Sequence, residues 1–263
     1  MRDYILVDGS YFCFFRYHAL LTWWKNAHKD EPLGDSPIEN MIFLEKFKKI
    51  FKQKLLEIVK KFATKNATVI IGKDCPRKEI WRNDIYEQYK ATRDSEDVFL
   101  GGPFFKLAYD ELFTDYQIIS HPRLEADDCI ALYTKHLIDT LPDVNVTIIT
   151  SDMDYLQLHR ENVQIYDLKW KSLMTSKCAF PTAVQNLFCK IVMGDKSDNI
   201  TSVFKKCGIK TAAKMYENQD EFIHRLNTHE NANALYQRNK TLVDFNEIPI
   251  VYVNEFKKTH LQN

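Results

Sequence analysis

The chain has 263 residues, enough for one large domain or for an α/β domain with a smaller appended part. Hydrophobic residues make up 45% and aromatic residues 13%, so the chain can bury a core and is not disordered throughout. The 36 basic and 36 acidic residues cancel, which argues against a uniformly basic nucleic-acid binder. It does not exclude a binder whose acids and bases occupy different segments.

Neither export nor membrane insertion is predicted. The apolar run from Tyr4 to Val7 is short and is followed by Asp8, unlike a signal peptide. No apolar stretch approaches the roughly 18 residues that a membrane span needs. The 6 cysteines include no Cys-x-x-Cys pair, so a zinc site is not expected. We expect a soluble intracellular protein with reduced thiols.

The first part of the chain predicts two strands and a long helix. Residues 4–7 predict a buried strand, and Ser10 is expected to cap the aromatic-rich helix that follows. An amphipathic, lysine-rich helix is expected from Ser36-Pro37 to about residue 65. Residues 68–71 predict a second strand, and basic, aromatic helical segments are expected over 78–93.

The middle of the chain continues this alternation. Helices are expected over residues 103–112 and 124–141, and strands over 116–119, 144–150 and 163–166. Strands that alternate with helices predict a mostly parallel central sheet covered by helices. From about Pro181 the pattern is helical as far as about Phe245. We therefore expect an α/β domain over 1–180 and a smaller helical region over 181–263.

Three aspartates follow predicted strands. Asp8, Asp74 and Asp152 each stand within two residues of a strand's carboxyl end, where ligands gather in parallel sheets. Carboxylates brought together in this way repel one another and raise each other's pKa. A divalent cation such as Mg²⁺ resolves the conflict, because it takes oxygen ligands and keeps several waters.

A second acidic group opens the predicted helix at 124–141. Glu125, Asp127 and Asp128 lie in the segment LEADDCIA. Acidic residues at a helix start often only complement the helix dipole, and for one lone acid we would favour that reading. Here the acids lie beside apolar residues, and several of them cannot all be surface caps. We therefore add them to the predicted metal-binding set.

Two further acidic pairs follow. Asp152 and Asp154 do not form a calcium loop of the EF-hand type, because Leu156 takes the next ligand position and no Gly or closing Glu follows. Asp195 and Asp198 have an ordinary capped turn as their alternative. Taken together, the acids suggest two cations about 3.5–4 Å apart, an arrangement that activates water and stabilises a leaving oxygen in phosphodiester cleavage.

Five sequence blocks, in this order, resemble the 5′ nuclease family. This family includes flap endonucleases, bacteriophage 5′→3′ exonucleases and the 5′-nuclease domain of bacterial DNA polymerase I. The resemblance covers about residues 3–217 and is greater to the compact phage enzymes. Its blocks are ILVDGS at 5–10 with Phe15-Arg16, YEQYKATRD at 86–94, LEADD at 124–128, ITSDMD at 149–154 and MGDKSDN at 193–199.

The resemblance implies two Mg²⁺ or Mn²⁺ ions. The first, or its waters, would be held by Asp8, Asp74, Glu125, Asp127 and Asp152. The second would be served by Asp128, Asp154, Asp195 and Asp198, and whether Asp127 and Asp128 bridge the two is left open. Lys90 and Arg93 match the family's basic pair, which faces the scissile phosphate. The expected catalytic residues are Lys90, Arg93, Asp8 and Asp152.

The resemblance also implies how DNA is held. Arg16 would contact a phosphate, and Tyr86 and Tyr89 would stack on unpaired bases, although aromatic residues on helices more often belong to the core. Residues 198–215 resemble a helix-hairpin-helix, which grips the duplex backbone and often holds K⁺ in the family. Its expected DNA contacts are Lys205, Lys206, Gly208, Lys210, Thr211 and Lys214.

The chain departs from the family pattern at two places. Lys206 stands where the hairpin usually has its first glycine, so a distorted hairpin without K⁺ is a possibility to test. The stretch from Arg93 to Glu125, where the family builds an arch over the 5′ strand, is short. A reduced arch would favour free ends, nicks or gaps over threaded flaps. No sliding-clamp peptide is visible near the C-terminal end, and a monomer is expected.

The predicted function is therefore a divalent-metal-dependent, structure-selective 5′ nuclease of DNA replication or repair. It would act as a 5′→3′ exonuclease, a flap endonuclease or both, with residues 1–180 catalytic and 181–263 DNA-binding. One alternative is a branched-DNA-binding module with weak or lost catalysis, but no expected carboxylate is missing. Another is a nuclease that removes RNA primers and acts on RNA–DNA hybrids.

Overall fold

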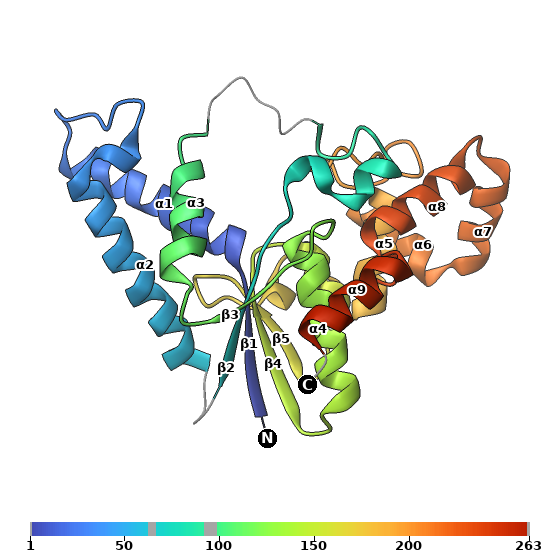
Figure 1. The fold of residues 1–263 in the computed structure, drawn as a ribbon. Coiled ribbons are helices and arrows are strands. Elements are labelled where there is room, and N and C mark those ends of the chain that lie inside the picture. Colours follow the sequence, from blue (N-terminus) through green and yellow to red (C-terminus); the bar gives the residue numbers. More distant parts are fainter. Residues whose placement is uncertain (1, 63–66, 92–98, 262–263) are drawn as a thin grey trace.

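A parallel sheet forms the centre of the protein. The computed structural model describes residues 2–62, 67–91 and 99–261. Within these ranges five strands form one sheet in the order β3-β2-β1-β4-β5, and every pair is parallel. The strands are β1 (Arg2–Asp8), β2 (Thr68–Gly72), β3 (Gln117–Ile119), β4 (Val144–Ile149) and β5 (Val163–Tyr166) (Figure 1). The predicted parallel sheet is confirmed.

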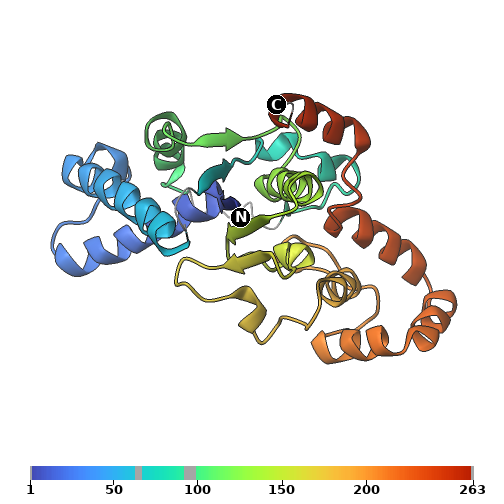
Figure 2. The ribbon, with the colours of Figure 1, turned by 90° about the horizontal axis from the view of Figure 1, so that it is seen from below.

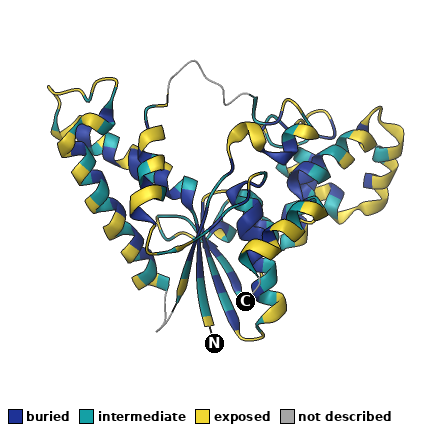
Figure 3. Ribbon diagram, in the orientation of Figure 1, coloured by how far each residue is buried: buried dark blue, intermediate teal, exposed yellow. Residues whose placement is uncertain are grey.

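Both faces of the sheet are buried. Alternate residues of a strand point to opposite faces, so Ile5 and Val7 of β1 join one apolar cluster while Leu6 joins the other. The neighbouring β2 is split in the same way, with Ile71 in the first cluster and Ile70 in the second. This burial explains the continuous apolar runs in β1 and β2, whereas β4 and β5 alternate in sequence and in burial. Figure 3 shows the buried strands between the helical layers.

Three helices cover one face. They are α1 (Gly9–Ala27), α2 (Met41–Phe62) and α3 (Gly102–Leu107), the last of which continues as a π-helical turn over Ala108–Leu112. Phe12, Phe43 and Phe51 are fully buried in this layer, and the Phe12 and Phe51 rings meet edge to face at 4.8 Å. Seen from below, the helices at the blue end of the chain project to one side of the sheet (Figure 2).

The other face is covered by α4 (Ala126–Thr140) and by α9 (Ile250–His260). The buried ring of Phe256 on α9 belongs to the same apolar cluster as the strands. The His121 imidazole lies 2.9 Å from Glu255, and Nε2 of His260 lies 2.8 Å from the carbonyl of Ser120. Helix α9 lies within the region predicted over 181–263, and it packs onto the α/β part. The predicted helical pattern ended too early.

The remaining helices form a smaller body. They are α5 (Ala183–Met193), α6 (Ile209–Glu217), α7 (Gln219–Thr228) and α8 (Ala232–Val243). Their apolar sides enclose a separate cluster that includes Cys189, Phe204, Met215 and Phe222. Figure 1 shows this body beside the sheet, on the side away from α2. None of the helices in the described ranges is long and apolar enough to cross a membrane.

Several predicted boundaries were wrong. Helix α1 is capped by Asp8 rather than Ser10, and the Asp8 carboxylate accepts a hydrogen bond from the Tyr11 N–H at 3.0 Å. Helix α2 starts at Met41, after a short 3-10 helix at Pro37–Glu39. Residues 78–91 form no long helix: 3-10 turns at Arg77–Glu79 and Trp81–Asp84 are separated by Ile80 in extended conformation. Further 3-10 turns lie at Met153–Leu158 and Leu173–Thr175.

Candidate active site

A cavity of about 360 Å³ opens at the carboxyl ends of the central strands. Asp8 ends β1, Asp74 follows β2, and Asp152 follows β4, as the strand pattern predicted. The first turn of α4 adds two acids from above the sheet. The charged residues that line the cavity are Asp8, Asp74, Lys90, Glu125, Asp127 and Asp152. The structure thus brings together the residues predicted for the first cation.

Asp8 is held by the first turn of α1 and by Thr150, the residue after β4. Its Oδ1 caps α1, while Thr150 Oγ1 donates to its Oδ2 at 3.3 Å. Burial raises the pKa of Asp8 to about 7, and the neighbouring carboxylates of Asp74 and Asp152 add to this. In the protein alone, the charged form of Asp8 is therefore costly near neutral pH.

The pKa values of Asp74 and Asp127 are also raised. The Asp74 carboxylate accepts a hydrogen bond of 2.7 Å from the Ala126 N–H at the start of α4. Burial is the main reason that the pKa of Asp74 is raised. Burial, and then repulsion from Asp128 and Glu125, raises the pKa of Asp127 well above its usual value. Oxygen donors that repel one another around a cavity are the ligand set that a hard divalent cation fits.

Glu125 differs because cations surround it. Its Oε2 accepts hydrogen bonds from Arg82 Nη1 and from the Tyr89 hydroxyl, each at 3.0 Å, and Lys90 Nζ pairs with its Oε1. Burial alone would raise the pKa of Glu125, but Lys90 and Arg82 outweigh it, and the pKa is lowered. Glu125 is therefore an anion at neutral pH.

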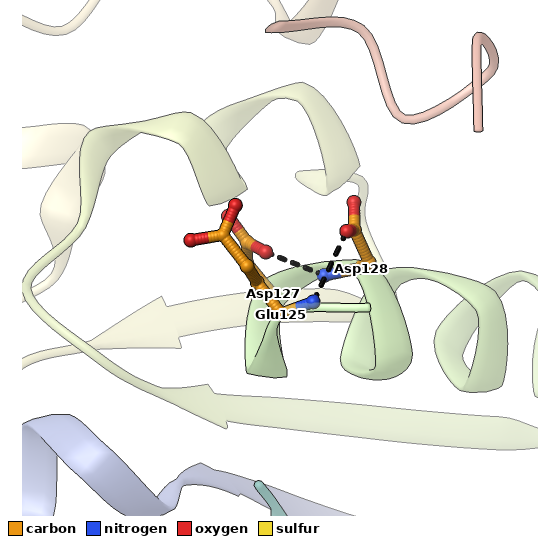
Figure 4. A group of neighbouring side chains, drawn as sticks. All are labelled: Glu125, Asp127 and Asp128. Atoms are coloured by element: carbon orange, nitrogen blue, oxygen red, sulfur yellow. Dashed lines mark hydrogen bonds between the residues drawn. The ribbon is translucent and has the colours of Figure 1, made fainter. Parts of the chain in front are cut away.

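The Asp128 carboxylate is bound by Arg82 and Trp81. Figure 4 shows the acids at the start of α4: Asp128 Oδ2 accepts from the Glu125 N–H at 3.2 Å, and Asp127 Oδ1 accepts from the Asp128 N–H at 2.7 Å. Asp128 has no exposed surface, and Arg82 and Trp81 bind both of its oxygens. Asp128 was predicted to serve the second cation, with a bridging role left open, and in the structure its carboxylate lies with those of Glu125 and Asp127.

The remaining acids form a second group. Carboxylate oxygens of Asp154, Asp195 and Asp198 lie within 4.8 Å of one another. The ammonium of Lys190 lies 2.5 Å from both Asp154 and Asp195. Burial raises the pKa of Asp154 to about 6 in spite of Lys190. Burial would also raise the pKa of Asp195, but Lys190 outweighs it and the pKa is lowered.

Sequence reasoning missed Lys190. Its position in the sequence could have indicated this role. Lys190 lies in the last turn of α5, five residues before Asp195, so its side chain can reach the acidic turn. Gly194 makes that turn: it has φ of 68°, and a Cβ there would lie 2.4 Å from the Ile200 carbonyl oxygen. The backbone N–H and carbonyl groups of Asp195 then form two hydrogen bonds with those of Ile200. This pairing orients the Asp195 carboxylate toward Lys190.

Lys90 connects the two acidic groups. Its ammonium pairs with Glu125 and lies 3.8 Å from Asp198 Oδ2, and its backbone N–H donates to the Asp198 carbonyl at 3.0 Å. Burial would lower the pKa of Lys90, but these carboxylates outweigh it and raise the pKa. Lys90 therefore presents a fixed positive charge to the cavity. Arg93, its predicted partner, lies outside the described residues.

Tyr86, Tyr89 and Arg16, which were predicted to contact DNA, make contacts within the protein. Tyr89 is 6% exposed, and its hydroxyl reaches Glu125 and Asp198, so its ring is not free to stack on a base. Tyr86 is half-buried, its hydroxyl donates to the Asn199 carbonyl at 3.2 Å, and the Arg238 guanidinium lies 4.5 Å from its ring centre. Arg16 is buried with its guanidinium 4.5 Å from the ring centre of Phe15.

The predicted hairpin is built without its first glycine. Lys206 adopts φ of 56°, the left-handed conformation that glycine takes most easily, so the chain turns there at some conformational cost. Gly208 caps α6, and the Thr211 N–H donates to the Gly208 carbonyl at 3.0 Å. The basic side chains on this turn and helix are exposed: Lys205, Lys206, Lys210 and Lys214.

Carboxylates that gather at the ends of parallel strands, beside a half-buried lysine, can hold cations of the kind that catalyse cleavage of phosphate esters. Residues 3–186 match the family model described as the 5′-3′ exonuclease, N-terminal resolvase-like domain. The chain therefore belongs to the 5′-3′ exonuclease family of nucleases.

Named relatives agree with this family. The chain is 29% identical over 231 residues to ribonuclease H of Enterobacteria phage T4, an overlap of 76% of this chain and 74% of that protein. It is 32% identical over 161 residues to a 5′-3′ exonuclease of Bacillus subtilis, covering 56% of this chain and 52% of that one. Against DNA polymerase I of Rhizobium leguminosarum the match spans 14% of the longer protein.

Solved structures share the fold. A crystal structure of the bacteriophage T5 flap endonuclease with DNA and metal ions superposes with a TM-score of 0.71 at 21% identity, covering 99% of this chain and 98% of that one. A T5 5′-exonuclease with bound zinc ions superposes with a TM-score of 0.70 at the same coverage. These likenesses extend the shared fold beyond the matched domain into the helical body.

Proposed function

We propose that this nuclease hydrolyses DNA phosphodiester bonds near 5′ ends, nicks and flap junctions, with two Mg²⁺ or Mn²⁺ ions. The observation that carries the proposal is the cavity where the carboxylates of β1, β2, β4 and α4 meet beside Lys90. The raised pKa values of Asp8 and Asp127 support it, because burial and neighbouring carboxylates make their charged forms costly and a bound cation would relieve that cost. The metal-bound DNA complex of the T5 flap endonuclease is consistent with it.

Each acidic group would serve one cation. Asp8, Asp74, Asp127 and Asp152, together with Glu125, would hold the first ion or its waters, and Asp154, Asp195 and Asp198 would hold the second. Asp128 is withdrawn from this set. When bound, such ions supply an activated water and stabilise the leaving oxygen. Lys190 balances the second group in the protein alone, and it would have to move aside or share those oxygens.

Lys90 would act on the substrate itself. A half-buried ammonium at the cavity wall stabilises charge that develops on a phosphoryl group during cleavage, and it does so without reorganising. Arg93 remains a predicted second cation for the same phosphate. The helix-hairpin-helix lysines would hold the duplex through its phosphates, independently of sequence. The K⁺ ion expected at that hairpin remains a proposal.

RNA–DNA hybrids are a second candidate substrate. The observation that favours them is the 29% identity to the phage T4 protein named ribonuclease H. An enzyme that removes RNA primers during replication would need this activity. Cleavage at the RNA strand of a hybrid would use the same carboxylates, so both substrates can be measured in one assay.

The test is a set of 5′-labelled substrates: flap, nick, gap, blunt duplex, single strand and RNA–DNA hybrid. Each is incubated with Mg²⁺, Mn²⁺ or EDTA, and Asp152→Asn is run beside the natural protein. We expect metal-dependent cutting near the 5′ junction, and its loss in the variant. Binding without cutting under either metal would replace the proposal by a DNA-binding module. The ratio of flap to nick cleavage tests whether the short arch limits threading.

In EDTA, Asp8→Asn should stabilise the protein by an amount that depends on pH. The pKa of Asp8 is raised from 3.8 to about 7, so the folded state binds this proton more tightly and its stability falls as pH rises through that window. Asn carries no such charge, so the advantage of the variant should grow between those values and level off above them. It should reach at most about 4 kcal/mol, since the pKa is raised by about three units and one unit corresponds to about 1.4 kcal/mol.

Thermal or urea unfolding at several pH values measures this difference. Saturating Mg²⁺ should shrink it, because a bound cation removes the repulsion that the variant relieves. An advantage that grew toward low pH instead would contradict the assigned pKa shift.

Removing the hairpin lysines should weaken DNA binding without changing the chemistry. For Lys210→Ala with Lys214→Ala, we expect binding to lose up to two phosphate contacts, so the slope of log affinity against log salt should fall by up to about 2. Fluorescence anisotropy with labelled duplex in Ca²⁺ would measure the slope, and Lys257→Ala on α9 is a control lysine away from the hairpin. An unchanged slope would move the duplex contact elsewhere.

A further inference from the structure

One buried guanidinium joins the metal-binding cavity to the helical body. Arg82 is 2% exposed, and its hydrogen bonds run in three directions. Its Nη1 donates to Glu125 Oε2 at 3.0 Å. The two sides of its fork hold Asp128, from Nη1 to Oδ2 at 2.8 Å and from Nη2 to Oδ1 at 2.7 Å. Its Nε donates to the carbonyl of Leu242 on α8 at 2.7 Å.

The surroundings leave this guanidinium little freedom. Its centre lies 4.7 Å from the ring centre of Trp81 and 5.9 Å from that of Tyr89, so aromatic rings confine it. Trp81 Nε1 also donates to Asp128 at 2.9 Å, and the Tyr89 hydroxyl also donates to Glu125. A planar guanidinium with fixed donors constrains the orientation of the carboxylates that it binds, whereas a flexible lysine ammonium does not. Arg82 thus sets where Glu125 can point.

The contact with α8 has a second consequence. Leu242 lies in the last turn of α8, so its carbonyl is one of those that a helix end leaves without an intrahelical partner. Arg82 satisfies it while binding the acids at the start of α4. One side chain therefore links the position of the helical body to the position of Glu125. Nothing in the proposed chemistry requires Arg82 to touch DNA, because Arg82 does not line the cavity.

We propose that Arg82 is a positioning residue for cation binding: held by Asp128 and by the end of α8, it orients Glu125 toward the cavity. Asp128 serves as its anchor rather than as a ligand. The inference rests on the proposed function, since it assumes that Glu125 holds a cation or its water. Partners that orient metal ligands typically change metal affinity or activity by about 10–100-fold when they are altered.

The test uses Arg82→Lys and a double variant, Arg82→Met with Asp128→Asn. The double variant removes both charges of the buried pair, which is often tolerated, so it protects the test against simple misfolding. Arg123→Lys is the matched control, because the ion pairs of Arg123 are with Asp84 and Glu79, which are not predicted metal ligands. Binding of MnCl₂ and MgCl₂ is measured by calorimetry without DNA, and duplex binding is measured in EDTA.

We expect both Arg82 variants to bind the cations about 10–100-fold more weakly, while duplex affinity stays within about twofold and Arg123→Lys behaves like the natural protein. Natural cation affinity in the double variant would overturn the inference, because Arg82 would then only neutralise Asp128. Equal losses of cation and DNA affinity would also overturn it, since they would show a general loss of structure. If the natural protein bound cations but cut no DNA, only the nuclease proposal would fail.

Discussion

Asp8→Asn is expected to lower the rate of DNA cleavage by about a thousandfold or more while leaving the fold intact. Asp8 lines the cavity and is a proposed ligand of the first cation. Metal ions supply several kcal/mol of transition-state stabilisation, about 1.4 kcal/mol for each tenfold in rate. Asn keeps the N-cap of α1, because its side-chain oxygen can accept the same bond from Tyr11. The variant therefore separates ligand charge from structure.

Single-turnover cleavage of a labelled flap or nicked duplex measures this effect. Asp167→Asn is a matched control: Asp167 follows β5 as Asp8 ends β1, and it caps a turn by accepting from Lys169 and Lys171, but it does not line the cavity. The control should cut at the natural rate. Cleavage by Asp8→Asn within tenfold of the natural rate would show that the first cation does not depend on this carboxylate.

Lys90→Met is expected to lower the maximal rate about 100- to 1000-fold with little change in DNA affinity. The loss of one fixed donor to a charged transition state typically has this magnitude. Met has a similar length and apolar body, so the variant removes mainly the charge. Because Glu125 would lose a compensating cation, we also expect the metal-free variant to be less stable.

The rate at saturating DNA and the affinity in Ca²⁺ are measured together. Lys73→Met is the control, since Lys73 lies next to Asp74 in the chain, but its ammonium faces the Tyr109 ring at 4.8 Å. A variant that bound DNA much more weakly but cut at the natural maximal rate would mean that Lys90 holds substrate rather than stabilising the reaction.

Several parts of this protein were predictable because the signal is local. Runs such as residues 4–7 and 69–71 are hydrophobic, as is typical of strands buried on both faces. Parallel strands end at the same edge of a sheet, so Asp8, Asp74 and Asp152 were expected to meet, and they line one cavity. The order of the acidic motifs along the chain indicated the family, which residues 3–186 confirm.

Other parts depend on contacts between distant residues. The sequence does not distinguish the roles of the neighbouring acids Glu125, Asp127 and Asp128. In the structure Asp127 lines the cavity, whereas Asp128 is bound by Arg82, which lies 46 residues earlier in the chain. Tyr89 shares a motif with Lys90, but its hydroxyl is needed by Glu125. Short 3-10 turns replaced the helix expected there, because burial of Trp81 and Arg82 outweighs local helical pattern.

The sequence by itself determined the sheet, its acidic edge and the kind of chemistry, since each follows from residue type and short-range spacing. Only the tertiary structure decided which acids face the cavity and which lysine pairs with each acidic group. It also decided that α9 packs onto the α/β part. The reason is physical: a carboxylate's role depends on which cation reaches it, and Arg82, Lys90 and Lys190 reach theirs only after the chain has folded.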